Sequence, residues 1–218
     1  MTTKKLCILF ALALCLPFAG TSQAATIFYN SQATYLAAIA SPGTDTFDDL
    51  PGGPLTGPLN RNAGIHTYTA STVGDFFLVG IPGDSWLSTD VVGDTMTFNN
   101  FSAGVRGFGA FFFATDVDGV FLPGKSITVS ATDGSGTNST TLTNTTTSTF
   151  LGIVSDQAFT SITVKSVQDG LVWPTMNDVI LGAVSTAPQV PEPGTWATVC
   201  LGLAGLGFAA RRRRGSRS

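Results

Sequence analysis

Charged residues, histidine and cysteine are all scarce in this 218-residue chain. Only 11% of its residues are charged and one is a histidine, whereas charged residues make up about 25% of an ordinary soluble protein. The three cysteines, Cys7, Cys15 and Cys200, lie within two apolar terminal segments. The central stretch therefore cannot form a disulfide framework, a thiolate zinc site or a cysteine nucleophile. The chain length and its 16 phenylalanines predict one compact domain with a sizeable core.

The charges are divided unevenly along the chain. Cations gather at the two ends, and the central body keeps four of them against thirteen aspartates, a formal net charge of −9; the four are Arg61, Arg106, Lys125 and Lys165. Such an acidic body repels phosphate backbones. The sequence therefore predicts no nucleic-acid partner.

The first 24 residues have the three parts of a secretory signal peptide. Lys4 and Lys5 form a basic start, and residues 6–18 form an almost wholly apolar stretch that is too short to span a bilayer comfortably. A small-x-small site follows and ends at Ala24. We expect export by the Sec machinery and cleavage by signal peptidase after Ala24.

The last residues combine an apolar segment with a block of cations. Residues 195–210 contain no charge and would reach about 24 Å as a helix at 1.5 Å per residue, which suffices when flanking arginines snorkel and the bilayer thins. Four arginines follow directly: Arg211, Arg212, Arg213 and Arg214. We expect a transmembrane helix over 195–210 and a basic tail, residues 211–218, that stays in the cytoplasm and leaves the body outside.

A short proline motif precedes the apolar segment and reads Val190-Pro191-Glu192-Pro193-Gly194. Its prolines fix φ and remove backbone donors, so the motif should be extended and separate from the helix behind it. The motif, a glycine- and leucine-rich apolar segment and an arginine block occur in that order in residues 187–218. Together they resemble a PEP-CTERM sorting signal, a segment that is also labelled an ice-binding protein C-terminal domain.

This resemblance implies export in a Gram-negative bacterium that makes extracellular polysaccharide. It implies a precursor anchored transiently in the inner membrane, and an exosortase that recognises Pro191, Glu192 and Pro193 and cleaves nearby. The product would go to the cell surface or the extracellular matrix. The motif would then be the substrate of another enzyme and not a catalytic site.

Residues 25–186 form the body, in which short strand-like runs recur between glycine, proline and aspartate turns. Residues 30–40 predict one short helix that Ser31 caps and whose apolar face holds Tyr35, Leu36 and Ile39. The fold class is therefore all-β, an antiparallel β-sandwich or jelly roll with one N-terminal helix. The strands are expected at residues 26–29, 65–70, 75–79, 95–98, 105–114, 126–131, 140–144, 150–154, 158–164 and 177–184, with a loop at 51–58.

No arrangement in the body favours catalysis. A Ser-His-Asp triad would need His66, and no Gly-x-Ser-x-Gly sequence is present. His66 lies in an alternating stretch and is expected to be an exposed strand residue. We therefore expect a protein that is not an enzyme. A hydrolase that uses a pair of aspartates stays as an alternative, because the sequence cannot show which aspartates are neighbours.

Calcium is the ion best suited to a body rich in oxygen ligands. A structural site of the jelly-roll type would join Asp45 or Asp48 to Asp178 in the last strand. Asp116 and Asp118 begin like a calcium loop, but the later ligands of an EF-hand are absent. Aspartates also cap turns and keep strand edges soluble. We favour this second interpretation and expect no cofactor.

Aromatic and hydroxyl side chains are the remaining candidates for binding. Trp173 precedes a proline in an expected loop and would offer a platform for a sugar ring; Trp86 and Tyr68 are further candidates, and core packing is an equal alternative for each. Alternate threonines at 143–149 would share one face of a strand. A flat threonine ladder could bind ice, but a single tract without a repeat favours a solvated hairpin.

The body has a resemblance of its own. Residues 28–39, the run 46–49 and the closing residues 177–182 are similar to bodies that accompany this sorting signal, some of which are similar to carbohydrate-binding jelly rolls. The leading hypothesis is a non-enzymatic surface or matrix protein whose body interacts with extracellular polysaccharide. The alternatives are a carbohydrate-binding module with structural calcium and a secreted aspartate-dependent hydrolase.

Overall fold

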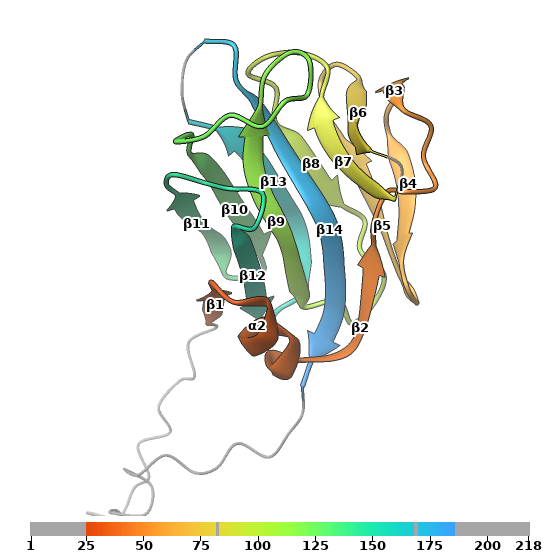
Figure 1. The fold of residues 1–218 in the computed structure, drawn as a ribbon. Helices are drawn as coiled ribbons and strands as arrows, with labels where there is room; N and C mark the ends of the chain where they lie inside the picture. Colours follow the sequence, from red (N-terminus) through yellow and green to blue (C-terminus); the bar gives the residue numbers. More distant parts are fainter. Residues whose placement is uncertain (1–24, 82, 168–169, 186–218) are drawn as a thin grey trace, which may run out of the picture. The chain divides into compact units, whose positions relative to one another are not determined.

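The computed structural model describes residues 25–81, 83–167 and 170–185. They form a sandwich of two antiparallel β-sheets, with one short helix, α2 (Gln32–Ala38), near one end (Figure 1). The expected all-β sandwich with one N-terminal helix is confirmed. The expected signal peptide, sorting motif and membrane helix lie outside the described residues.

The larger sheet has eight strands in the order β1-β12-β9-β14-β7-β6-β3, and β2 pairs with β14 beside this path. The long strand β14 is shared, because β7 pairs with Thr175 and Met176 while β2 pairs with residues 179–184. The strands of this sheet are β1 (Thr26–Tyr29), β2 (Ile39–Asp45), β3 (Gly53–Leu55), β6 (Phe76–Ile81), β7 (Asp84–Thr89), β9 (Gly107–Thr115), β12 (Phe150–Ser155) and β14 (Trp173–Val184).

The smaller sheet has six strands in the order β11-β10-β13-β8-β5-β4. Its strands are β4 (Leu59–Ala63), β5 (His66–Ser71), β8 (Met96–Asn99), β10 (Ile127–Asp133), β11 (Gly136–Leu142) and β13 (Phe159–Ser166). In β10 the buried residues alternate strictly with partly exposed ones, which is the pattern of a sheet with one face toward the core.

The core lies between the two sheets, and β9 contributes to it most visibly. Phe108, Ala110, Phe112 and Ala114 belong to the main cluster of buried apolar side chains. Each fully buried phenylalanine stabilises the fold by roughly 1.5–3 kcal/mol. The intervening residues of β9 are also mostly buried, because further side chains cover the outer face of this sheet.

Helix α2 covers part of that outer face through Tyr35, which is fully buried. Its ring lies over glycines: a Cβ built on Gly152 would come within 2.5 Å of the Tyr35 ring, and one built on Gly109 within 2.8 Å. The Tyr35 hydroxyl donates a hydrogen bond to the carbonyl oxygen of Ile180 at 2.9 Å, and burial raises its pKa. The glycines are therefore required by close approach. Tyr35 is buried as predicted, but Leu36 is 37% exposed. Ile39 is buried but begins β2 and does not belong to the helix, which ends at Ala38 and not at residue 40.

Four strands, β2, β3, β4 and β7, were not expected from the sequence. β4 has the sequence Leu-Asn-Arg-Asn-Ala. Its Arg61 points inward and can be buried because it donates hydrogen bonds to Asp45 and Asp49. β7 begins at Asp84, which we expected in a turn. The sequence pattern failed at both places because a tertiary contact, and not hydrophobic alternation, decides them.

Candidate functional site

An arginine and an aspartate from different sheets are buried together. Arg61 on β4 donates from Nε to Asp45 Oδ2 at 2.9 Å and from Nη2 to Asp45 Oδ1 at 2.5 Å, and the two side chains are 9% and 3% exposed. Arg61 also donates to both oxygens of Asp49, at 2.9 and 2.6 Å. The hydroxyl of Tyr68 and the backbone N–H of Phe47 donate to Asp45 at 2.7 and 3.1 Å.

These hydrogen bonds stabilise the charged forms of Arg61 and Asp49 and use both carboxylate oxygens of Asp45. Burial lowers the pKa of Arg61, but hydrogen bonds to Asp49 and Asp45 outweigh it and raise the pKa; the hydrogen bond from Arg61 lowers the pKa of Asp49. Burial, followed by the charge of Asp45, raises the pKa of Tyr68. Both oxygens of Asp45, one of the alternative calcium ligands, already accept hydrogen bonds within the protein. Tyr68 is buried and is not a platform for a sugar ring.

A second acidic group joins Asp48, Asp84 and Asp178. Burial, followed by the charges of Asp84 and Asp48, raises the pKa of Asp178. Asp178 lies at a register shift of β14 with a φ of 55°, and Asp84 Oδ1 accepts hydrogen bonds from Trp86 Nε1 and Asn177 Nδ2, both at 2.9 Å. The fold thus brings Asp48 close enough for its charge to act on Asp178.

Proximity is not enough to hold an ion. Within the residues that the structure describes, no group of three or more His, Cys, Asp or Glu side chains is arranged to hold a metal ion. A calcium site at Asp48 and Asp178 stays an untested alternative. The Asp48 carboxylate has partners within the protein, because hydrogen bonds from Thr46 and Ser85 stabilise its charged form and lower its pKa.

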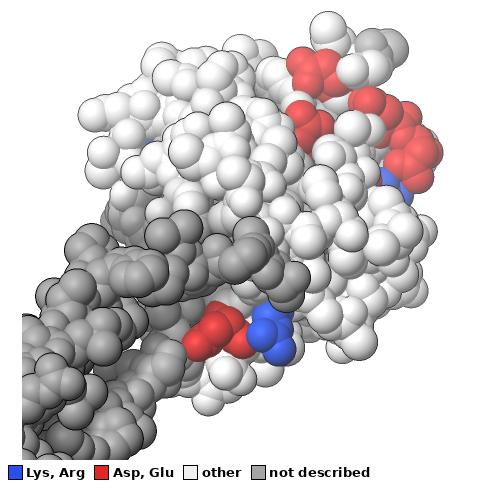
Figure 2. Space-filling view, turned by 90° about the horizontal axis from the view of Figure 1, so that it is seen from below, with Lys and Arg blue, Asp and Glu red and all other residues white. Residues whose placement is uncertain are grey.

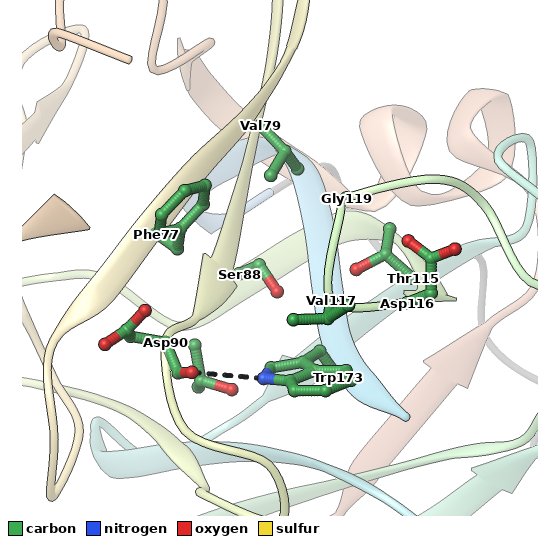
Figure 3. Close-up of a pocket in the computed structure, with 10 residues that line it drawn as sticks. Phe77, Val79, Ser88, Asp90, Thr115, Asp116, Val117, Gly119 and Trp173 are labelled. Atoms are coloured by element: carbon green, nitrogen blue, oxygen red, sulfur yellow. Dashed lines mark hydrogen bonds between the residues drawn. The ribbon is translucent and has the colours of Figure 1, made fainter. Parts of the chain in front are cut away.

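Trp173 lines a pocket of about 150 Å³ on the outer side of the larger sheet (Figure 3). Its walls also include Ser88, Thr115, Asp116 and Val117. The Trp173 side chain is 7% exposed, and its Nε1 donates to a backbone carbonyl oxygen, that of Asp90, at 3.3 Å. Trp173 is therefore not the exposed platform that we expected, but a buried ring that forms one wall of a small pocket.

A chain of buried hydroxyls lies beneath this pocket. Thr115 Oγ1 and Thr175 Oγ1 are 2.8 Å apart, and the Thr175 hydroxyl is 3.1 Å from Ser88 Oγ. Ser88 in turn donates to the carbonyl oxygen of Pro174 at 3.2 Å. Since these hydroxyls are paired with one another, they hold the strands together, and two of them, those of Ser88 and Thr115, also line the pocket.

Two other candidates for a binding site, Trp86 and His66, make contacts within the protein. Trp86 packs edge-on against Phe113, with 4.9 Å between ring centroids. His66 is 6% exposed, and its Nε2 donates to the carbonyl oxygen of Ser41 at 2.9 Å. The expectation that His66 is an exposed strand residue is wrong, because the ring joins β5 to β2.

The outer face of the smaller sheet consists almost wholly of neutral hydrogen-bonding side chains, and we call it the hydroxyl face. Sixteen residues alternate with core residues along its six strands, and all but Lys165 are serine, threonine or asparagine. The fifteen are Asn60, Asn62, Thr67, Thr69, Ser71, Thr97, Asn99, Thr128, Ser130, Thr132, Thr137, Ser139, Thr141, Ser161 and Thr163.

Hydroxyls of the hydroxyl face pair across its strands. Thr128 and Thr141 are 3.0 Å apart, and Thr132 and Thr137 are 2.9 Å apart. Ser130 also pairs across the strands, accepting from Ser139 at 2.8 Å. These hydrogen bonds restrict the side chains. The spacing of the strands places the rows of hydroxyls about 4.8 Å apart.

The threonines at 143–149 do not form a flat ladder, the alternative that the sequence left open. β11 ends at Leu142, Asn144 has a φ of 52°, and Thr145 is fully buried with its N–H bonded to the carbonyl oxygen of Lys125. The face of aligned hydroxyls arises instead across six strands. Alternation such as Ile-Thr-Val-Ser-Ala-Thr-Asp in β10 signals it locally, but only the strand order assembles it.

Comparison with known proteins finds one sorting motif in this chain. Residues 189–214 match the model of the PEP-CTERM protein-sorting motif, which indicates an exported protein with a membrane-anchored precursor that an exosortase sorts. No curated protein matches the chain. No helix among the described residues is long and apolar enough to cross a membrane.

Two solved structures are similar to this chain at low sequence identity. One is the CBM22-1 xylan-binding domain from Paenibacillus barcinonensis Xyn10C, with 16% identity and a TM-score of 0.33 over 66% of this chain and 94% of that one. The other is the CBM22-1-CBM22-2 tandem domain from the same protein, with 16% identity and a TM-score of 0.33 over 68% of this chain and 46% of that one.

Proposed function

We propose that this chain is a surface or matrix protein of a Gram-negative bacterium, cut by an exosortase near residues 190–194, and that its body acts by binding extracellular polysaccharide and not by catalysis. The match at residues 189–214 carries the first part. The hydroxyl face supports the second part, because fifteen of its sixteen residues carry neutral hydrogen-bonding side chains.

The sorting segment has the physical properties that a membrane-bound processing enzyme requires. Pro191 and Pro193 restrict φ and lack backbone donors, which would suit the extended substrate that a protease binds. Glu192 supplies a single charge that a cationic site could bind. The apolar residues 195–210 would hold the precursor in the membrane, with Arg211–Arg214 as the cytoplasmic stop.

The hydroxyl face suits a neutral polysaccharide. Hydroxyl and amide groups both donate and accept hydrogen bonds, as sugar hydroxyls do. Threonine side chains are stiff at χ1 and are here paired with their neighbours, so little conformational entropy is lost on binding. Aspartates are absent from the face, so it does not repel a polymer that carries scattered anionic groups.

The pocket at Trp173 supports a second function, a module that recognises one defined glycan. Its wall combines an aromatic ring with hydroxyl and carboxylate groups, which is the chemistry that orients a sugar in a small site. The same chain would then bind at one pocket and not over a face. We propose the hydroxyl face as the main surface because the pocket has room for a small group only.

Replacing Pro191, Glu192 and Pro193 with alanine tests the processing step. The variant should accumulate as the tailed precursor in the membrane fraction, whereas the unaltered chain should be released. Intact mass of the released protein gives both cut sites. Equal release of the two forms would contradict sorting through this motif.

A further inference from the structure

Most edge strands of the two sheets are protected against pairing with another chain. The edge strands of the larger sheet, β1 and β3, have only four and three residues, and β3 contains Pro54, which has no backbone N–H to donate. β2 and β4 lie against each other, because a Cβ built on Gly43 would overlap the carbonyl oxygen of Ala63. Short strands, proline and covered edges all hinder the addition of a further strand.

Strand β11 is an edge strand with none of these features (Figure 1). It is seven residues long and pairs with β10 without a register shift. It contains no proline and no charged residue, and most of its residues are exposed. Within the part of the chain that the structure describes, β10 is its one paired neighbour. The outer edge of β11 is therefore open to another strand.

The backbone of β11 directs donors and acceptors away from the sheet. In an antiparallel ladder, residues that bond the neighbouring strand through both N–H and C=O alternate with residues whose two groups point the other way. The two-residue turn at 134–135 makes Asp133 and Gly136 the first bonded pair. Counted from this pair, Thr137, Ser139 and Thr141 direct their N–H and C=O groups outward.

The surroundings of β11 are uncharged, although the body as a whole is acidic. A formal net charge of −9 opposes contact between two copies of the body. Figure 2 shows charged side chains gathered in separate groups on the face seen from below. Residues 134–155, which include β11, β12 and the loop between them, contain no charged residue. Two copies can therefore meet through this edge without bringing like charges together.

We propose that β11 pairs with β11 of a second copy of this chain, antiparallel and about a two-fold axis at Ser139. In this register Ser139 lies opposite Ser139 of the second copy, and Thr137 lies opposite Thr141, so the outward N–H and C=O groups of the two strands bond one another. Serine already pairs with serine, and threonine with threonine, between β10 and β11.

This pairing joins the hydroxyl faces of the two copies. Directly opposite residues of an antiparallel pair point to the same side of the sheet. Thr137, Ser139 and Thr141 belong to the hydroxyl face in each copy, so the two faces become one continuous surface across the two-fold axis. The inference goes beyond the proposed function and does not depend on polysaccharide binding.

Cysteine cross-linking tests the register, because the described body contains no cysteine. Residues in a bonded antiparallel pair have Cα atoms about 5.5 Å apart, which is within the range of a disulfide. In the mature protein, with Cys200→Ser as the background, Ser139→Cys should form a disulfide-linked dimer on mild oxidation. Thr137→Cys is the matched control and should stay monomeric on a non-reducing gel, because the two copies of position 137 lie about 13 Å apart along the strands.

Sedimentation of the mature protein measures the pairing itself. We expect a mass twice that of one chain. Ser139→Pro should halve this mass, because proline removes an outward N–H and leaves the hydrogen bonds to β10 in place. Where proline disturbs folding, Ser139→Lys replaces it, since it places two like charges opposite each other. Asn60→Lys, at an exposed position of β4, is the matched control and should stay dimeric.

Two kinds of result would overturn this inference. A single-chain mass up to millimolar concentration excludes the second copy as the occupant and leaves the β11 edge to an extended segment of another protein. A dimer that Ser139→Lys leaves intact, or one that cross-links equally at 137 and 139, shows that the copies meet elsewhere. Both results leave the proposed sorting and the proposed polysaccharide binding standing.

Discussion

The guanidinium of Arg61, on the smaller sheet, donates hydrogen bonds to both carboxylate oxygens of Asp45, at the end of β2 in the larger sheet. The pair joins the two layers of the sandwich in a nearly solvent-free place. Removing one partner of such a pair leaves the other charge buried and unpaired, which typically costs 3–5 kcal/mol.

Arg61→Ala should therefore lower the free energy of unfolding by about 3 kcal/mol or more, measured by urea denaturation. Arg106→Ala, which removes an exposed arginine, is the matched control and should change it by less than about 0.5 kcal/mol. Similar unfolding midpoints for the two variants would show that the pair contributes little.

Gly152→Ala should destabilise the fold, because the new Cβ would lie within 2.5 Å of the Tyr35 ring. Overpacking of this kind costs about 1–3 kcal/mol. Gly52→Ala is the control, since a Cβ there meets nothing within 4 Å. Thermal melts of the two variants compare them, and an unchanged midpoint for Gly152→Ala would mean that helix α2 moves aside freely.

Asp178→Asn should stabilise the protein at pH 7. The folded-state pKa of Asp178 is raised by burial and by Asp84 and Asp48, so the folded form binds this proton more tightly than the unfolded form. Stability from this group is gained as the pH falls through the raised pKa and is absent at neutral pH. The gain in the variant should be a few tenths of a kcal/mol at pH 7 and should shrink toward pH 4. A variant less stable at pH 7 would contradict the repulsion.

Adding calcium tests whether Asp48, Asp84 and Asp178 bind this ion. We expect millimolar calcium to leave the thermal midpoint of the mature protein unchanged, because the hydrogen bonds of Asp48 and Asp84 already serve the protein. Magnesium at the same concentration is the control for ionic strength. A rise with calcium alone that Asp178→Asn abolishes would establish a calcium site and favour the carbohydrate-binding module with structural calcium.

Thr163→Glu should weaken binding to a neutral polysaccharide about tenfold, equivalent to about 1.4 kcal/mol, because it puts an unpaired charge in the middle of the hydroxyl face. Affinity electrophoresis of the mature protein measures it. Gln157→Glu adds the same charge outside the face and should have no effect. Loss of binding in Val117→Glu, beside the Trp173 pocket, with Thr163→Glu unaffected would assign recognition to the pocket.

The sequence pattern predicted most of the strands because alternation is a local property. β1 was placed at its observed bounds, and β10, β12 and β13 within two residues at each end. The pattern failed for β4 and β7, whose buried polar residues find partners far away in the chain. It failed again at residues 143–149, where Thr145 is drawn into a turn by a backbone carbonyl 20 positions earlier.

The candidate site was also predictable only in part. The residue types that could bind a sugar or calcium were all visible in the sequence, but their exposure was not. Trp173, Tyr68 and His66 are buried, and each makes a hydrogen bond to a residue at least 23 positions away. Exposure depends on what covers a side chain, and contacts of that range are not encoded in neighbouring residues.

By itself the amino-acid sequence determined the two ends of this protein and its β character, because a basic start, an apolar stretch, a Pro-Glu-Pro motif and two-residue alternation all act through adjacent residues. Only the tertiary structure decided that Asp45 serves Arg61, that glycines make room for Tyr35, and that fifteen scattered polar residues form one face. Those outcomes follow from strand order and register, which bring together side chains separated by tens of residues.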